Sequence, residues 1–170
     1  AGWVVDTQPP DAPTVTGGPS GPSRSAEARF EFSGEDQARF ECRLNAGPWL
    51  LCPTPVSFGP VAEGRHEAWF RQVDPAGNRS AATSRTWVMD STPPAVRSAD
   101  LSRIGRRGRY VLSVRASDAG SGPGRIEVSF SVSRRNARVD RVVPWQQIGR
   151  VSISGRKAPL WVRAVDRAGN

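Results

Sequence analysis

Hydrophobic and polar residues alternate along most of the chain, which is the pattern of half-buried β-strands. In ARFEFSG, from Ala28, and ARFECRL, from Ala38, every second residue is apolar and would face the same side of a sheet. No long stretch repeats its apolar residues every three or four positions, so we expect no helices. The pattern predicts strands near 13–16, 28–33, 38–44, 55–58, 66–73, 84–90, 96–101, 109–117, 125–133, 138–143, 148–153 and 159–166.

Turn signals separate these segments, at GGPSGPS, AGP, GRRG, GSGPG and two copies of AGN. In each AGN turn the glycine can adopt a positive φ, while the neighbouring Asp and Asn side chains bond nearby backbone amides. The sequence therefore predicts structural turns formed by Asp74, Gly77, Asn78, Asp166, Gly169 and Asn170.

Two motifs recur, which indicates tandem units of nearly equal size. WVVDTQPP, from Trp3, returns as WVMDSTPP, from Trp87, and WFRQVDPAGN, from Trp69, returns as WVRAVDRAGN, from Trp161. Double prolines interrupt strand pairing and mark the boundaries. We expect an all-β chain of two tandem immunoglobulin-like antiparallel β-sandwiches: an N-terminal extension over 1–10, domain 1 over 11–94 and domain 2 over 95–170.

Composition and charge narrow the classes of partner. The chain has 170 residues with 17 Gly and 15 Pro, as in a folded, turn-rich protein, and no apolar run long enough for membrane insertion. Residues 1–94 carry 8 Arg and 11 acidic residues, net −3, whereas residues 95–170 carry 16 basic and 5 acidic residues, net +11. A basic half suits anionic cell-envelope or matrix polymers, or the acidic half of another copy. No nucleic-acid recognition module is evident, so we expect no specific nucleic-acid binding.

The residue types also argue against catalysis. The chain has one histidine and two cysteines, so a nucleophilic triad or a zinc site would depend on His66, which we expect at the surface near a strand end. No phosphate loop or HExxH motif is present, and we expect no catalytic residue, no enzyme activity and no cofactor. One alternative is calcium, with Asp90, Asp118, Asp166 or Asn170 as hard oxygen ligands, although turn formation is the favoured role and no metal is expected.

A family resemblance follows from the order of the motifs. The sequence FECRLNAGPWLLCPTP, followed by GRHEAWFRQVDPAGN and TWVMDSTPP, resembles the Ig-like repeat found in tandem in secreted and surface proteins of bacteria. The resemblance covers residues 11–94, while the second unit shares WVRAVDRAGN but lacks both cysteines. It implies an extracellular location, secreted or at the cell surface, and leaves the function open because such repeats serve many roles.

The two cysteines are the candidates for a disulfide. Cys42 and Cys52 lie ten positions apart, with Gly47 and Pro48 between them, so a bond would close a local hairpin. The resemblance implies an oxidising compartment, in which this pair is expected to be bonded. Two free thiols remain the alternative.

The ends of the sequence suggest how copies could associate. The second unit stops at Asn170, before any counterpart of the last strand of the first unit. A sequence of that type stands instead at the N-terminus, which makes a candidate inter-subunit strand of Ala1, Gly2, Trp3, Val4, Val5 and Asp6. Donation of this strand to domain 2 of the next copy would give a head-to-tail filament with itself as partner. Trimming from a longer chain is the other explanation.

Three functions therefore stand at this point. A self-assembling extracellular structural protein comes first, and an excerpt of a long bacterial surface adhesin with tandem Ig-like repeats second. The third is a carbohydrate-binding accessory module of a secreted hydrolase, which an exposed aromatic platform would favour.

Overall fold

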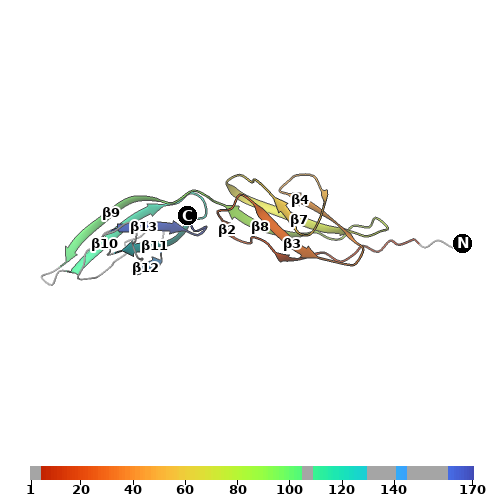
Figure 1. The fold of residues 1–170 in the computed structure, drawn as a ribbon, viewed down its shortest axis with the longest axis horizontal. Helices are drawn as coiled ribbons and strands as arrows, with labels where there is room; N and C mark the ends of the chain where they lie inside the picture. Colours follow the sequence, from red (N-terminus) through yellow and green to blue (C-terminus); the bar gives the residue numbers. More distant parts are fainter. Residues whose placement is uncertain (1–4, 105–108, 130–140, 145–160) are drawn as a thin grey trace. The chain divides into compact units, whose positions relative to one another are not determined.

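The fold is all-β and divides into two compact units. The computed structural model describes residues 5–104, 109–129, 141–144 and 161–170, and these contain strands and no helix (Figure 1). Unit 1 is Ala1–Met89 and unit 2 is Asp90–Asn170. Within the described residues, no helix has the length and apolar character to cross a membrane.

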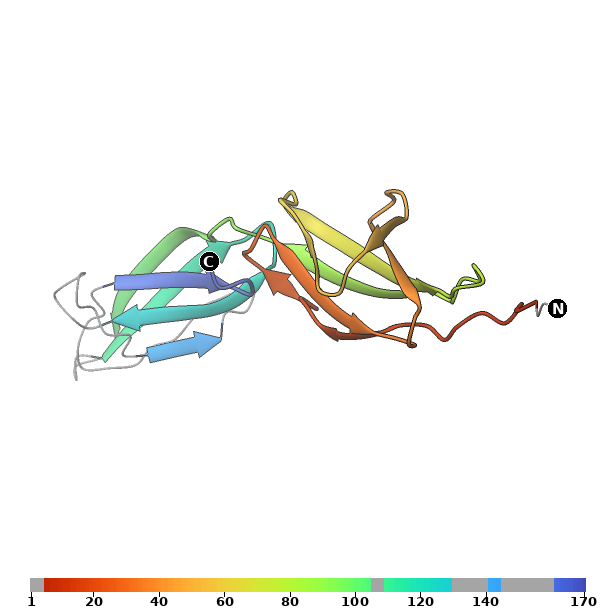
Figure 2. The same cartoon turned by 45° about the vertical axis from the view of Figure 1, so that its right-hand side comes forward.

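Unit 1 contains two sheets whose strands are almost all antiparallel (Figures 1 and 2). One sheet has the order β1-β3-β6 and the other β2-β8-β7-β4-β5, in which β2 and β8 are the parallel pair. This arrangement is consistent with a β-sandwich. The strands are β1 (Thr14–Gly17), β2 (Pro22–Ser23), β3 (Ala28–Ser33), β4 (Arg39–Leu44), β5 (Leu50–Cys52), β6 (Val56–Phe58), β7 (Gly64–Val73) and β8 (Thr83–Met89).

An aromatic cluster forms the core of unit 1. Strict alternation in β3 and β7 directs Phe30, Phe32 and Phe70 inward, as the sequence pattern predicts. Trp87 of β8 joins them with 2% of its surface exposed, and its ring centroid lies 5.3 Å from that of Phe30 in an edge-to-face contact. The last strand of unit 1 thus supplies a large share of its core.

Unit 2 is built from five strands in the part of the chain that the structure describes. These are β9 (Ala95–Ile104), β10 (Arg109–Ser117), β11 (Pro123–Ser129), β12 (Arg141–Pro144) and β13 (Trp161–Asp166). The strands β9 and β10 form one antiparallel pair, and the other sheet has the order β12-β11-β13. The buried cluster between them is aliphatic: Leu112, Val114, Ile126, Val128 and Ala164.

The predicted strands agree well with the observed ones, with informative exceptions. The alternating segment 28–33 is β3 as predicted, whereas the short edge strands β2 and β5 were not predicted, because two or three residues carry no periodic signal. The predicted strand 148–153, and the predicted residues 130–133, 138–140 and 159–160 of neighbouring strands, lie outside the described residues.

His66 is not at the surface, and that expectation was wrong. It lies on the inner face of β7 with 8% of its surface exposed, and its ring centroid is 5.3 Å from that of Trp87. Its Nε2 is 2.7 Å from the Ala62 carbonyl oxygen and its Nδ1 is 3.2 Å from Nδ2 of Asn45. Both ring nitrogens are therefore occupied by structural hydrogen bonds.

The predicted disulfide between Cys42 and Cys52 is confirmed. It joins β4 to the edge strand β5, where Phe40 pairs with Cys52 and Cys42 with Leu50, and the two Cα atoms are 5.9 Å apart. The bond holds the short edge strand β5 against its neighbour β4.

Removing this bond should destabilise unit 1. A loop of about ten residues closed by a disulfide restricts the unfolded chain, and we expect the double substitution Cys42→Ala, Cys52→Ala to lower the free energy of unfolding by about 2–3 kcal/mol. Urea denaturation followed by tryptophan fluorescence measures the change. Reduction of the wild-type protein should produce a similar loss; equal stability of the oxidised, reduced and double-Ala proteins would contradict this assignment.

Candidate functional site

Three carboxylates meet at one end of unit 2. Asp90 follows the last residue of unit 1, Asp118 follows β10, and Asp166 ends β13. One carboxylate oxygen of each lies within 4.8 Å of the others, and both Asp90 and Asp166 are buried, with Asp90 0% exposed. The structure thus brings together the three aspartates that the sequence names as potential calcium ligands.

Backbone amides hold each of these carboxylates. Asp90 accepts hydrogen bonds from the amides of Ser121 at 2.6 Å and Thr92 at 3.1 Å, and Asp118 accepts one from Gly122 at 2.6 Å. The Asp90 carboxylate fits because residue 120 is glycine: a Cβ there would lie 2.4 Å from the Asp90 Cγ atom. The cluster therefore depends on a loop that leaves room for it.

Asp166 and Asn170 form the turn at the end of the sequence. Asp166 Oδ1 accepts the amides of Gly169 at 2.7 Å and Asn170 at 2.9 Å, and Gly169 has a φ of 92°. The Asn170 side-chain amide donates to the Asp166 carboxylate at 3.0 Å and to the main-chain carbonyl of Asp90 at 2.6 Å. The Nδ2 group of Asn170 thus joins the turn to the first residue of unit 2, and we call this pair of hydrogen bonds the clamp.

The same clamp is present in unit 1. Asp74 accepts the Asn78 amide and side chain, each at 2.8 Å, Gly77 has a φ of 95°, and the Asn78 side chain donates to the Asp6 carbonyl at 3.1 Å. The hydrogen bonds from Asn78 lower the pKa of Asp74 below its ordinary value, outweighing the opposing effect of burial. Each unit therefore anchors the aspartate that precedes its own first strand.

Burial and hydrogen bonding act in opposite directions on Asp90. Burial raises the pKa of this carboxyl, but the bonds from Ser121 and from the Thr92 amide outweigh burial, so the pKa lies below its ordinary value. Asp90 is thus a buried carboxylate at neutral pH. Three carboxylate groups at this spacing are hard oxygen donors of the kind that Ca²⁺ accepts, so these residues have the chemistry to hold such a cation.

A second charged group lies on the outer face of the β11–β13 pair. Glu127 is buried and bonds Arg125 at 2.7 Å, and it also pairs with Arg163, its cross-strand neighbour. Burial raises the pKa of Glu127, whereas the two guanidinium groups lower it, with a net shift below the ordinary value. The Glu127–Arg163 ion pair links β11 to its neighbour β13.

The other edge of β13 is the candidate site for a partner strand. Within the described residues β13 pairs with β11 alone, and none of them forms a ladder with its second edge. A groove of about 630 Å³ runs beside it, lined by Pro93, Pro94, Val96, Trp161, Val162, Arg163, Ala164 and Asn170. The buried Nε1 of Trp161 has no hydrogen-bond acceptor in the described part of the protein. These features are those of an acceptor for an extended chain.

The candidate donor segment is described only at its end. Residues Ala1–Val4, including Trp3, lie outside the described residues. Val5 is 64% exposed. The main-chain carbonyl of Asp6 accepts a hydrogen bond from the Asn78 side chain, and its carboxylate accepts the Gln8 amide at 3.0 Å.

The sequence indicated both aspartate turns but not the clamp from each Asn side chain to the main chain of a distant Asp. The residues joined by each clamp are about 70–80 positions apart, and no local pattern relates them.

Comparison with known proteins leaves the family of the chain open. No protein-family model matches the sequence, and no curated protein is significantly similar to it.

Unit 2 should lose stability in acid. Because the pKa values of Asp90 and Glu127 are lowered in the folded state, their stabilisation is complete above the ordinary carboxyl range and is lost as the pH falls through the lowered values. Urea unfolding between pH 7 and pH 2, followed through amide signals of β11 and β13, should show this loss. Glu127→Gln should flatten the profile; an unchanged profile in that variant would contradict the role of the ion pair.

Asp118→Asn should stabilise unit 2 in the presence of a chelator. The substitution keeps an oxygen for the Gly122 amide and removes one of three mutually repelling charges, so we expect the melting temperature of unit 2 to rise by about 4–8 °C, as for 1 kcal/mol in a unit of this size. A lower melting temperature for Asp118→Asn than for the wild type in EDTA would contradict the repulsion.

The same two proteins test calcium binding. A melting temperature that rises with CaCl₂ in the wild type but not in Asp118→Asn would assign a cation to the cluster, and no rise in either would leave the aspartates as turn formers.

Proposed function

We propose that the protein is an extracellular structural protein of two tandem Ig-like domains that joins copies head-to-tail by strand addition at β13. The observation that carries the proposal is the open edge of β13 with its apolar groove. Catalysis has no part in this function, and the Cys42–Cys52 disulfide supports an oxidising location such as the cell surface.

Unit 1 supports the proposal because it contains the strand that the described part of unit 2 lacks. In unit 1, β8 pairs with β7, the strand that carries the first WxRxVDxAGN-type motif. The second copy of that motif is on β13, so the open edge of β13 corresponds to the edge of β7 that β8 covers. Trp87 of β8 fills the core of unit 1, and WVVD, from Trp3, repeats the WVMD that contains it.

The register of β8 specifies how a donated strand would lie. Trp87 is opposite His66, and Thr83 and Ser84 are opposite Phe70 and Trp69. Transferred to β13, this register places the Trp-Val-x-Asp motif beside residues 156–158, outside the described residues, and places the preceding residues beside Trp161 and Val162. In this register Ala1–Asp6 would end before Trp161. Pairing along Trp161–Ala164 therefore requires the donated strand to lie further along β13, shifted by an even number of residues so that Trp3 stays on the inner face.

Charge and anchoring favour the same arrangement. Asn78 holds Asp6 in the way that Asn170 holds Asp90, so a donated strand would leave unit 1 from a fixed point. The −3 and +11 halves of the sequence attract each other at low salt, which favours head-to-tail contacts between copies. Such a contact does not close on itself and so extends into a filament.

Deleting Ala1–Asp6 should abolish assembly. Sedimentation velocity at increasing concentration should show growing species for the wild type and a non-growing species for the deletion variant, because the donor is lost. Unit 1 should keep its aromatic near-ultraviolet signal. A synthetic peptide with the sequence of Thr83–Asp90 should bind the deletion variant more tightly than a peptide with the sequence of Ala1–Asp6, because it covers more of β13.

The matched control is the longer peptide with proline at the position of Arg85, the residue of β8 opposite Ala68 of β7. The proline removes a backbone donor on the edge that would face β13, and the peptide should bind at least tenfold more weakly. A wild-type protein that stays monomeric at high concentration, or peptides whose affinity does not respond to the proline, would contradict strand addition. A monomer would favour the alternative of an adhesin segment.

A further inference from the structure

On the outer face of unit 1, the guanidinium group of Arg43 lies close to two indole rings. The Arg43 guanidinium, on β4, lies 4.9 Å from the ring centroid of Trp49 and 5.1 Å from that of Trp69. Trp69 is its cross-strand neighbour on β7, and Trp49 directly precedes β5. Both indoles are partly exposed, so the face combines aromatic surface with a cation.

The positive charge of Arg43 has no acidic partner in the described part of the chain. Glu41, the nearby carboxylate on β4, is bonded by Arg71 at 2.7 Å through Nε and lies 3.5 Å from the Nε of Arg79. Arg43 appears in none of the ion pairs of the described residues, and its Nε is buried without a hydrogen-bond partner. A ligand carboxylate would supply the counter-charge that no acidic side chain of the described residues gives to this guanidinium group.

Unit 2 provides an internal comparison. Its Glu127–Arg163 pair occupies the register of the Glu41–Arg71 pair, so the ion pair is common to both sheets. The residue opposite Trp161 in unit 2 is Ser129, whereas the residue opposite Trp69 in unit 1 is Arg43. A sheet of this type therefore forms without an arginine at this position.

We propose that Arg43, Trp49 and Trp69 form a binding surface for an acidic polysaccharide, with Arg43 binding the carboxylate of a uronic acid unit. The planar guanidinium matches a carboxylate in shape and charge. The Arg71 guanidinium also lies over the Trp49 ring, 4.2 Å from its centroid, so the apolar surface offered to a sugar ring is the part of the two indoles that the guanidinium groups leave exposed. This inference is independent of strand addition, because none of the three residues lies in unit 2.

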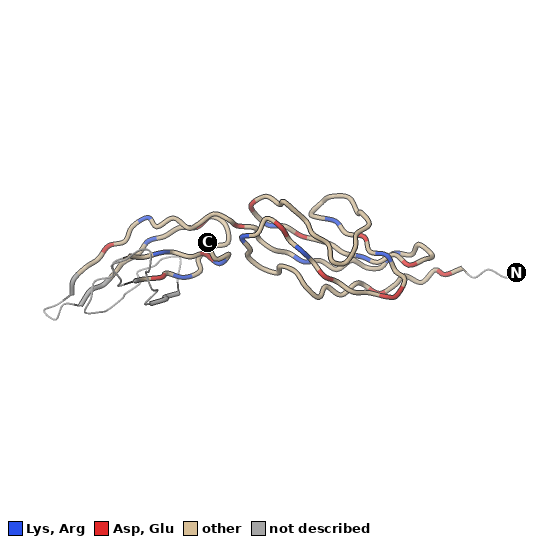
Figure 3. The backbone as a smooth tube through the Cα atoms, in the orientation of Figure 1, with Lys and Arg blue, Asp and Glu red and all other residues tan. Residues whose placement is uncertain are grey.

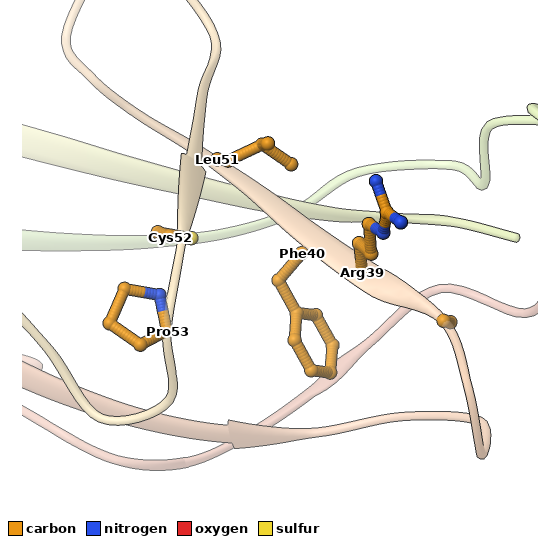
Figure 4. Close-up of a pocket in the computed structure, with 6 residues that line it drawn as sticks. Arg39, Phe40, Leu51, Cys52 and Pro53 are labelled. Atoms are coloured by element: carbon orange, nitrogen blue, oxygen red, sulfur yellow. The ribbon is translucent and has the colours of Figure 1, made fainter.

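The surroundings favour a sugar chain over an acidic peptide. Leu51, 67% exposed, lies opposite Glu41 and extends the apolar surface beyond the indoles. In Figure 4 the side chains of Leu51 and Arg39 project to one side of their strands and that of Phe40 to the other, and all three line a small pocket together with Cys52 and Pro53. Basic side chains are spread among acidic ones along unit 1 (Figure 3), so a general attraction for polyanions does not arise there and the unpaired Arg43 is the local feature.

The test compares two arginine substitutions that remove the same charge. Binding of the full chain to polygalacturonate is measured by isothermal titration calorimetry at about 0.15 M salt, where exposed charges are largely screened. We expect Arg43→Gln to weaken binding at least tenfold and Arg43→Lys to weaken it several-fold, because lysine lacks the planar fork. Arg29→Gln, on the exposed side of β3 beside Glu31, should change the affinity less than twofold.

Additional probes separate the alternatives. Neutral dextran should bind far more weakly than polygalacturonate, and poly-glutamate should show no dependence on Arg43. The wild-type Nε–H signal of Arg43 should shift on adding polygalacturonate, which reports the contact without a substitution. No binding by the wild type, an equal loss in Arg43→Gln and Arg29→Gln, or a poly-glutamate affinity that falls with Arg43→Gln would each overturn the proposal.

Discussion

The hydrogen-bonding requirement of a sheet edge is the constraint on which the account of unit 2 depends. Backbone N–H and C=O groups at an edge need partners, and an apolar groove beside them needs a cover. In unit 1, β8 meets both needs, because it pairs along β7 and buries Trp87 among Phe30 and His66. In unit 2, the described residues leave both needs unmet at β13.

The two cores differ in whether they include a last strand of the β8 type. The core of unit 1 is aromatic and includes its own last strand, whereas the described core of unit 2 consists of aliphatic residues from β10, β11 and β13. The aspartate turns are the shared framework. In each, an Asn side chain clamps the main chain of the aspartate at the entry to the unit, so the entry point of each unit is defined by its own final turn.

Local patterns predicted the parts of this structure that depend on local physics. Alternation located β3, β4 and β7, and the cysteine spacing together with the family resemblance predicted the disulfide. The burial of His66 could not be predicted, because it depends on Ala62 and Asn45 supplying partners for both ring nitrogens. Arg43 carried no sequence signal either, since Trp49 and Trp69 reach it from different strands.

The most direct test of strand addition is hydrogen exchange at β13 as a function of protein concentration. The amides of Val162 and Ala164 can be compared with those of Phe70 and Gln72, the corresponding residues of β7. If a strand from another copy pairs with β13, the amides of β13 that face away from β11 should become protected as the concentration rises, while those of β7 stay constant. Protection at β13 that does not depend on concentration would contradict the account.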